Sequence, residues 1–334
     1  MFHKTLAAAL AAAALLAGAA KAETLRFSSF EPPQAFITGT ILARWAEDVT
    51  AASEGTLNVR MFAGGTLGRS PAQQLELVES GVADLAWIVT GYNPGRFDGS
   101  LVAELPFAVT SATSGSVALW KLHEEGLLAG DYDKFKVVGV VTSSPNAVVS
   151  TGAIAQPEDL RGRNFRASSP LLLKALEALG AVPVGGITGS NLAESISRGL
   201  IFGTFNEWNA IQTFRIDEAA GHVLEVPMGT STMLVLMNKA KYDGLPEAAK
   251  AAIDRHSGLA FSEAFGAAFD ANVVDHRAKV VADGKTKVTE PSAEQLQAWR
   301  AAVQPVTDGW IEATPNGRAI YDRFIELIAE VDAR

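Results

Sequence analysis

The stretch LNVRMFAGGTLGRSPAQQLELVESGVADLAWIV, residues 57–89, contains a strand–helix–strand unit that decides the fold class. Residues 57–61 alternate apolar and polar side chains, as a half-buried strand does. Residues 71–80 place Leu75 and Val78 on one face, with Gly81 directly after them, which is typical of a helix that ends at a glycine. Residues 82–89 are largely apolar and predict a buried strand. This order of elements favours a mostly parallel α/β sheet.

Predicted strands and helices also alternate on both sides of this stretch. A second strand–helix–strand unit follows in the middle of the chain. A chain of 334 residues exceeds the usual size of a single hydrophobic core. We therefore predict two α/β lobes. The further predicted elements are strands at 25–27, 137–141, 147–150, 164–167 and 182–184 and helices at 36–50 and 170–179.

Two later segments indicate that the chain crosses between the lobes. Residues 232–238, TMLVLMN, read as a strong buried strand that can return to the first sheet. Residues 246–283 are helix-like and contain no internal proline, so we predict one long helix that spans both lobes as a spine. The boundaries that we predict are residues 23–143 with 232–271 for lobe I, and residues 144–231 with 272–334 for lobe II.

Residues 1–22 have the pattern of a cleaved signal peptide. Lys4 precedes an apolar run at residues 6–20, and Ala20-Lys21-Ala22 matches the small-x-small cleavage pattern. The alternative is an N-terminal membrane anchor, but this alanine-rich run is shorter than the about 20 residues of a membrane span. We expect cleavage after Ala22 and a mature protein that works in the periplasm or outside the cell.

Composition excludes several classes of function. The net charge is −9, and removal of residues 1–22 with their two lysines makes it −11, so we expect no nucleic-acid partner. The chain has no cysteine, which excludes a thiol nucleophile, a cysteine-ligated metal and any disulfide. No pair of histidines has the spacing of metal ligands on one helix, so we expect no metal.

Catalytic and cofactor motifs are also missing. The loop at residues 63–70, AGGTLGRS, follows a strand and precedes a helix, as a phosphate-binding loop does. Its glycine spacing is one residue short, however, and Arg69 stands where such a loop has lysine. No Gly-x-Ser-x-Gly sequence supplies a serine nucleophile. We therefore predict no catalytic residues and no cofactor, and conclude that the chain is not an enzyme.

The sequence does contain residues suited to recognising an organic anion. Arg166 lies at the end of a predicted strand and precedes the start of a helix at Pro170. A guanidinium there can donate two parallel hydrogen bonds to a carboxylate, and the helix N-terminus adds positive potential. The alternative is a surface ion pair. Residues 199–209, GLIFGTFNEWN, combine glycines, aromatic rings and amides, which suit an organic ligand in a cleft.

Taken together, eight stretches of the sequence resemble the solute-binding subunits of tripartite ATP-independent periplasmic (TRAP) transporters, of the DctP type. The resemblance implies two α/β lobes of the periplasmic binding protein fold, joined by crossing strands and a spine helix, with a ligand cleft between them. It also implies a protein that closes on a small organic acid and delivers it to a membrane permease without ATP. We further expect the protein to be a monomer. The stretches are residues 45–55, 62–68, 81–87, 91–97, 104–107, 159–166, 179–183 and 237–239.

This resemblance implies roles for individual residues. In the family an arginine at the end of the Asp-Leu-x-Gly-x-x-x-Arg segment binds the ligand carboxylate, and here it is Arg166. A family asparagine that helps to hold the carboxylate falls on Asn206. Two positions depart from the family pattern: Phe202 replaces an aspartate, and Asn146 stands where sugar-acid binders carry a second arginine.

Some family members carry a Pro-Trp-Glu triplet in the same turn. Residues 207–209, Glu-Trp-Asn, resemble this triplet with both flanks changed. Trp208 and Asn209 therefore line the cleft in place of Asn206 or beside it.

The first lobe supplies further cleft candidates, because ligands of α/β proteins meet the carboxyl ends of strands. Phe30 and Glu31 follow the first strand, Gly65 follows the second, and Trp87 and Tyr92 accompany the third. The alternatives are core positions for Phe30 and Trp87 and a turn cap for Tyr92. If half of these aromatic side chains face the cleft, the pocket favours a ligand with a ring and one carboxylate.

Two other classes of function stay open on the sequence alone. One is a secreted enzyme on a similar two-lobed scaffold, because a fold does not fix a function. The other is a binding protein that serves an ATP-driven importer or a sensor kinase.

Overall fold

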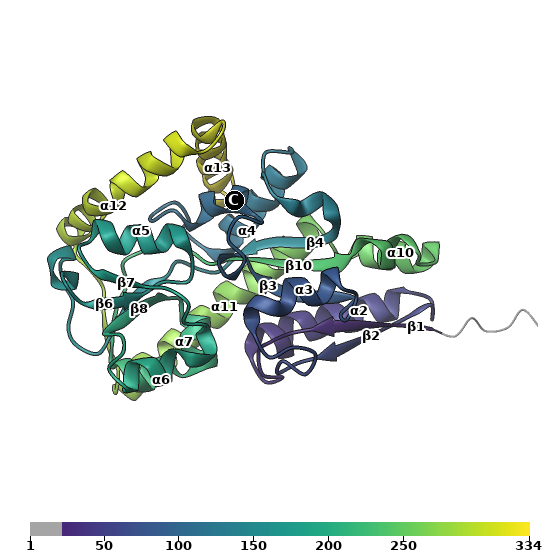
Figure 1. Cartoon of the computed structure of the whole chain (residues 1–334), viewed down its shortest axis with the longest axis horizontal. Coiled ribbons are helices and arrows are strands. Elements are labelled where there is room, and N and C mark those ends of the chain that lie inside the picture. The colour runs from purple at the N-terminus through teal and green to yellow at the C-terminus, as the bar shows by residue number, and fades with distance from the viewer. Residues whose placement is uncertain (1–21) are drawn as a thin grey trace, which may run out of the picture.

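The computed structural model describes residues 22–334, which form two β-sheets with helices around them (Figure 1). The predicted signal peptide, residues 1–22, lies outside the described residues apart from Ala22. We call the regions around the two sheets the five-stranded half and the six-stranded half. The five-stranded sheet has the order β2 (Leu57–Phe62), β1 (Glu23–Ser28), β3 (Leu85–Val89), β10 (Thr232–Asn238), β4 (Phe135–Thr142). The six-stranded sheet has the order β11 (Lys287–Thr289), β9 (His222–Leu224), β5 (Ala147–Ser150), β8 (Gly203–Asn206), β6 (Asn164–Arg166), β7 (Val182–Val184).

The predicted α/β class and the returning strand are confirmed. In the five-stranded sheet β1 pairs in parallel with β2 and β3, as the strand–helix–strand pattern predicts. β10 comes back from the six-stranded half and pairs antiparallel with both β3 and β4. Its central place in the sheet explains its continuous apolar sequence, since both of its faces are covered.

Helices cover the sheets and create three hydrophobic clusters. One cluster lies under α2, α10 and α11 on the five-stranded sheet, one lies under α6, α7 and α8 on the six-stranded sheet, and the largest extends across both halves. The α-helices are α2 (Ala43–Ala52), α3 (Gln74–Glu79), α4 (Ala112–Glu124), α5 (Pro170–Ala178), α6 (Leu192–Ser197), α7 (Trp208–Phe214), α8 (Ile216–Ala220), α9 (Lys239–Asp243), α10 (Glu247–Arg255), α11 (Leu259–Asp283), α12 (Ala293–Ala313) and α13 (Gly317–Asp332). Shorter helical turns are η1 (Ile37–Leu42), η2 (Pro71–Gln73), η3 (Thr90–Tyr92), η4 (Asp98–Glu104), η5 (Asp131–Lys134), η6 (Pro157–Leu160) and η7 (Gly189–Asn191).

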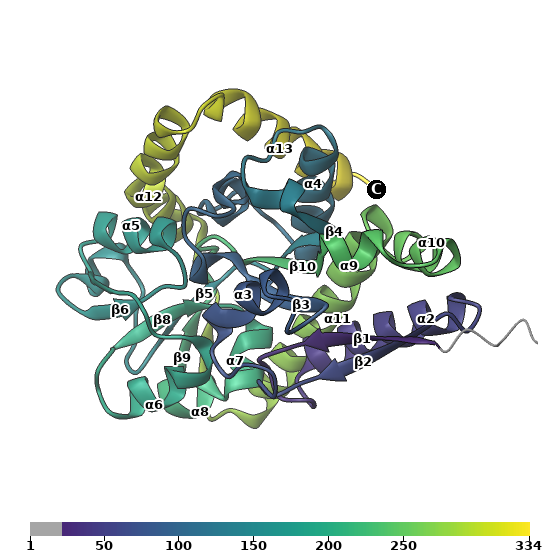
Figure 2. The same ribbon diagram turned by 45° about the vertical axis from the view of Figure 1, so that its right-hand side comes forward.

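The predicted spine helix is divided into two helices, and only the second one is long. The expected helix at 246–283 is wrong as a single element, because α10 ends at Arg255 and α11 begins at Leu259. Gly258 separates them with a φ of 74°, and a Cβ there would lie 2.9 Å from the Trp120 ring. The 25-residue α11 still contacts α4 and β4 in one half and α7 in the other (Figure 2). Among the helices of residues 22–334, none combines the length and apolarity that a membrane crossing requires.

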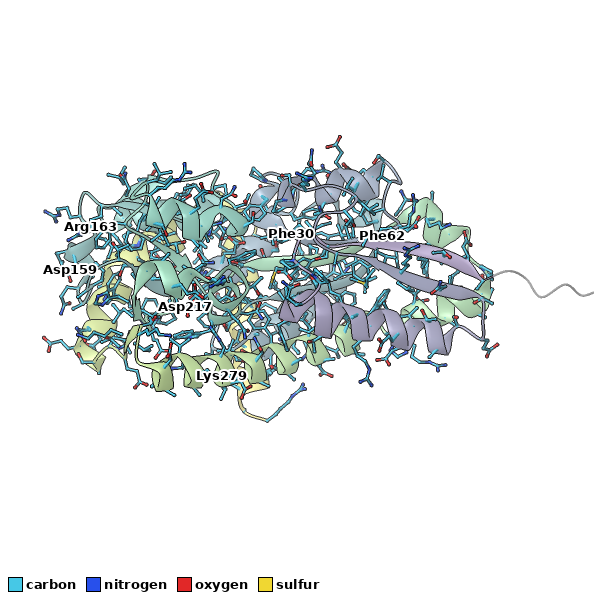
Figure 3. All side chains as sticks on the ribbon, turned by 90° about the horizontal axis from the view of Figure 1, so that it is seen from below. Phe30, Phe62, Asp159, Arg163, Asp217 and Lys279 are labelled. Carbon is cyan, nitrogen blue, oxygen red and sulfur yellow. The ribbon has the colours of Figure 1, made fainter. Side chains whose placement is uncertain are left out.

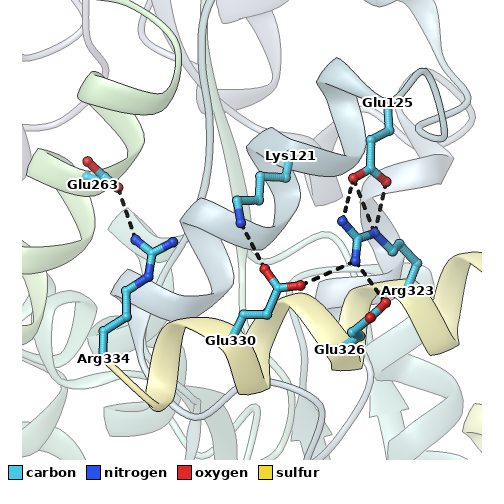
Figure 4. A network of polar contacts seen from close by, with 7 residues as sticks. All are labelled: Lys121, Glu125, Glu263, Arg323, Glu326, Glu330 and Arg334. Carbon is cyan, nitrogen blue, oxygen red and sulfur yellow. Dashed lines mark hydrogen bonds and ion pairs between the residues drawn. The ribbon is translucent and has the colours of Figure 1, made fainter.

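The C-terminal helices form an arch across the two halves (Figure 2). α12 packs on α5 of the six-stranded half, and α13 packs on α4 of the five-stranded half. Arg323 on α13 pairs with Glu125 at 2.7 Å, and Lys121 pairs with Glu330 at 3.1 Å (Figure 4). These pairs are partly exposed and contribute little, so the packing of Phe324 matters more. The division of the chain into two lobes at the expected boundaries stays a prediction.

A substitution at Gly203 tests the packing of the six-stranded sheet. A Cβ at this position of β8 would lie 2.3 Å from the carbonyl oxygen of Val149 and 2.4 Å from the Phe165 ring. We expect Gly203→Ala to lower the free energy of unfolding by about 1–3 kcal/mol, because the backbone of β5 cannot move away cheaply. Urea denaturation measures this change.

Gly309→Ala is the matched control. Gly309 lies inside α12 with no atom within 4 Å of a Cβ, so alanine there should stabilise the helix by up to about 1 kcal/mol. Equal stabilities of the two variants would refute the close packing at Gly203.

Candidate functional site

Arg166 is a buried cation at the place where the two halves meet. It is the last residue of β6, pairs with Thr204 of β8, and its side chain is 1% exposed. Its Nε donates to the Ile187 carbonyl oxygen at 2.8 Å, and Nη1 and Nη2 donate to Asn206 and Tyr92. All three acceptors are neutral, and no carboxylate of residues 22–334 forms an ion pair with Arg166. The surface ion pair considered as the alternative is therefore not what the structure contains.

The chain around Arg166 is shaped to hold an anion near it. Helix α5 begins at Pro170, four residues after Arg166, and the Ser169 hydroxyl caps it by accepting from the Leu172 N–H. The positive end of this helix dipole therefore lies next to the guanidinium. Gly91 lets the loop after β3 approach from the other half, since a Cβ there would lie 2.5 Å from the Ser168 carbonyl oxygen.

Tyr92 links the two halves at the guanidinium. Its hydroxyl oxygen accepts from Arg166 Nη2 and from the Gly189 N–H, both at 3.1 Å. A phenol oxygen has two lone pairs and one proton, so both lone pairs are occupied and the proton is left to donate. Tyr92 therefore offers an O–H donor beside Arg166.

Asn206 supplies another donor from the end of β8. Its Oδ1 accepts from Thr204 Oγ1 at 2.7 Å and from Arg166 Nη1 at 3.5 Å. Because a guanidinium can only donate, this contact fixes the orientation of the amide and turns its NH₂ group away from Arg166. We call Arg166, Tyr92 and Asn206 the carboxylate receptor, because their donors suit the oxygens of a carboxylate.

Two buried carboxyl groups face the same region from opposite halves. Glu31 follows β1, and burial raises its pKa to about 7 even though Thr38 Oγ1 donates to it at 3.0 Å. Glu207 begins α7, where the N–H groups of Asn209 and Ala210 donate to it at 2.5 and 2.7 Å. Burial raises the pKa of Glu207 to about 8, and the negative charge of Glu31 adds to the rise. The sequence analysis missed Glu207, because no pattern distinguishes a buried glutamate from a solvated one.

Three further candidates are buried with polar atoms left without partners among the described residues. Trp87 packs on Phe265 with 5.8 Å between ring centroids, and its Nε1 has no acceptor. Asn209 has an unpartnered Nδ2. Asn146 donates to the Met228 carbonyl oxygen at 3.4 Å, and its Oδ1 has no donor. Such atoms are rare in folded proteins, so they mark places where a ligand group or water can bind.

The last three candidates lie beside or behind these groups. Trp208 packs in the core of the six-stranded half, and its Nε1 donates to Glu225 at 3.1 Å. Gly65 has a φ of 70° and donates to the Ser29 carbonyl oxygen at 3.0 Å, which fixes the backbone next to Glu31. Phe30 is half-buried at the border of the two halves (Figure 3). Ligand contact by these residues stays a prediction.

Surface cavities open along the same border. A cavity of about 280 Å³ is lined by residues of both halves, including Tyr92, Ser168 and Ile187. A second of about 440 Å³ includes Asn146 and Trp208 in its lining. A groove of the same volume between α2 and α11 contains none of the buried polar candidates. No cluster of three metal-ligating side chains occurs in the part of the chain that the structure describes.

The chain is similar to known solute-binding proteins. The family model "Bacterial extracellular solute-binding protein, family 7" matches residues 27–313. A marine metagenome TRAP solute-binding protein specific for aromatic acid ligands, solved with 3-hydroxybenzoate, is 30% identical with a TM-score of 0.87, covering 92% of this chain and 98% of its own. A TRAP solute-binding protein from Rhodoferax ferrireducens T118 with copurified benzoate is 27% identical with a TM-score of 0.86 and the same coverage. The curated relative TsaT of Comamonas testosteroni, described as an outer membrane transporter protein, is 27% identical over 91% of this chain and 90% of its own.

The two buried glutamates predict a pH-dependent stability. Each has an ordinary pKa of 4.5 and a folded value of about 7 or 8, so folding favours the protonated form. Their contribution to stability is fully present below pH 4.5 and is lost as the pH rises through 7 to 8. Relative to the unsubstituted protein, Glu31→Gln and Glu207→Gln should each gain on the order of 2 kcal/mol between pH 5 and pH 8.

Urea denaturation over this pH range measures the gain. Burial also lowers the pKa values of the half-buried His123 and the buried His276. Their effect on stability cancels between each variant and the unsubstituted protein, because every variant retains both histidines. Glu312→Gln, at an exposed position on α12, is the control. Its difference in unfolding free energy from the unsubstituted protein should be the same at every pH. If the stability difference between Glu31→Gln and the unsubstituted protein were also independent of pH, the burial of the Glu31 charge would be contradicted.

Proposed function

The chain belongs to bacterial extracellular solute-binding protein family 7, the solute-binding proteins of TRAP transporters, and we propose that it captures an aromatic monocarboxylate and hands it to a TRAP permease. This family consists of binding proteins rather than enzymes. The observation that carries the proposal is the buried guanidinium of Arg166, which has neutral acceptors and no ion-pair partner in residues 22–334. A buried cation of this kind costs several kcal/mol unless an anion joins it.

The surroundings of Arg166 support one carboxylate and a ring. Asn146 is neutral at the position that resembles the second arginine of sugar-acid binders, so a single guanidinium is available. Trp87 and Phe30 contribute aromatic surface from the five-stranded half. The two structural neighbours reported above were solved with 3-hydroxybenzoate and benzoate, which are acids of this class.

Closure of two lobes is the proposed capture mechanism. Lobe I comprises residues 23–143 and 232–271, and lobe II comprises residues 144–231 and 272–334. A carboxylate bound to Arg166 of lobe II also accepts from Tyr92 of lobe I, so the ligand favours the closed state. The permease then recognises the closed form. Cleavage after Ala22 places the mature, monomeric protein in the periplasm.

Removal of Arg166 tests the proposal. Isothermal titration calorimetry of benzoate, mandelate and succinate, after unfolding and refolding to remove copurified ligand, should show that the aromatic acids bind most tightly. Arg166→Ala should cost about 3 kcal/mol of binding free energy, or more than 100-fold in affinity, since it removes the only charged donor for the carboxylate.

Arg163→Ala is the matched control, because Arg163 lies on the same segment, is exposed, and stacks on Phe202 at 4.0 Å. It should bind the acids as the unsubstituted protein does. Undiminished affinity of Arg166→Ala would remove Arg166 from the site.

A second variant tests the link between the halves. Tyr92→Phe removes the O–H donor and the acceptor for Arg166 and Gly189 while keeping the ring. We expect its affinity for benzoate to fall by about tenfold, as for one hydrogen bond to a charged group. Calorimetry at one salt concentration measures this, and an unchanged dissociation constant would show that Tyr92 does not contact the carboxylate.

A further inference from the structure

Three buried polar groups lie outside the carboxylate receptor. Trp87 is 0% exposed and its indole Nε1 has no acceptor within hydrogen-bond geometry. Asn209 is 1% exposed and its Nδ2 is also unpartnered among residues 22–334. The carboxyl group of Glu31 is buried beside them with a hydroxyl, not a cation, as its hydrogen-bond donor. Two unpartnered donors and one acceptor point to a ligand group that satisfies all three.

Contacts along the chain bring these groups together from three elements. Ser28 of β1 pairs with Ala86 of β3, so Trp87 lies one position beyond this pair, beside the start of the segment from Ser29 to Glu31. Pro32, which follows Glu31, lines the same cavity as Gln212 of α7. The charge of Glu31 also raises the pKa of Glu207 at the start of α7. Glu207 accepts the backbone N–H of Asn209 at 2.5 Å. We call Trp87, Glu31 and Asn209 the distal polar cluster.

The distal polar cluster and the carboxylate receptor are built on the same strand ends. β3 contains Trp87 and leads into Tyr92, and β8 ends at Asn206, directly before Glu207 and Asn209. The five-stranded half supplies one side and the six-stranded half the other. A single ligand between the halves therefore faces both groups.

We propose that the distal polar cluster binds a hydroxyl group of the ligand, remote from its carboxylate, with Trp87 Nε1 and Asn209 Nδ2 donating and Glu31 accepting. A hydroxyl has two lone pairs and one proton, which match two donors and one acceptor. The inference rests on the proposed function, which supplies the carboxylate at Arg166. It narrows the ligand class to hydroxylated aromatic monocarboxylates.

The same cluster disfavours two other ligands. A second carboxylate at this place would meet Glu31 and Glu207, both buried and both acidic, and like charges in a buried site repel strongly. An unsubstituted ring would leave the N–H groups of Trp87 and Asn209 without acceptors, and sites built to bind a hydroxyl reject analogues that lack it. An ordered water that satisfies the same donors is the competing occupant.

Calorimetry with a matched ligand series tests the proposal. The probes are benzoate, its ortho, meta and para hydroxy derivatives, and isophthalate as the matched dicarboxylate. We expect at least one hydroxybenzoate to bind at least about tenfold more tightly than benzoate, and isophthalate to bind more weakly than benzoate. We call the ratio of hydroxybenzoate to benzoate affinity, both measured on the same variant, the hydroxyl advantage. Trp87→Phe and Asn209→Leu should reduce this ratio to about threefold or less.

Trp120→Phe is the matched control. Trp120 lies on α4, is 9% exposed, and also has an indole N–H without an acceptor. It lies outside the distal polar cluster, so its variant should keep the full hydroxyl advantage. Thermal melts of every variant check folding, and Asn209→Leu provides an independent test if Trp87→Phe does not fold.

The outcomes separate the two proposals. The proposal is supported if Trp87→Phe and Asn209→Leu both lose the hydroxyl advantage and Trp120→Phe keeps it. Equal affinities for benzoate and all three hydroxybenzoates, with benzoate binding still dependent on Arg166, overturn the cluster, assign the donors to water, and leave the proposed function standing. A hydroxyl advantage that both variants keep also overturns it. Failure of every aromatic acid to bind overturns both proposals.

Discussion

The buried guanidinium of Arg166 is the constraint on which the site depends. A cation removed from water must be compensated, and here three neutral oxygens from three separate elements hold it in one orientation. These contacts fix the position of the charge before any ligand arrives, so binding does not have to order the side chain. The short strand β6, the capped start of α5 and the glycine at position 91 all serve this arrangement.

The same arrangement couples binding to the contact between the halves. Tyr92 comes from the five-stranded half and touches Arg166 and Gly189 of the other half, so the guanidinium is fully enclosed only when the halves are together. The charge of Glu31 also raises the pKa of Glu207, so each carboxyl group disfavours the ionised form of the other. In the proposed mechanism, an anion at Arg166 supplies the differential affinity that shifts the balance toward a closed form. α11 and the arch of α12 and α13 contact both halves and limit how far they separate.

The sequence predicts the elements better than the interior of the site. The bounds of β5 and β10 are as expected because each is a continuous apolar run between polar residues. The break at Gly258 was missed because alanine-rich sequence continues across it, and only the nearby Trp120 ring shows that glycine is needed there. Arg166 was found from its place at a strand end. The burial of Glu207 and the unpartnered atoms of Trp87 and Asn209 depend on which elements meet, which local patterns do not encode.

The protonation states of Glu31 and Glu207 also determine the net charge of the site. With a monocarboxylate bound, Arg166 is neutralised, and two ionised glutamates would leave two uncompensated negative charges in a buried region. Burial raises the pKa of each glutamate to near or above neutrality, so the closed site favours their protonated forms. With both glutamates protonated, a dicarboxylate would still bring a second negative charge, and Arg166 can neutralise only one. The charges of these residues therefore fit the proposed ligand class, which has one carboxylate, independently of the shape of the pocket.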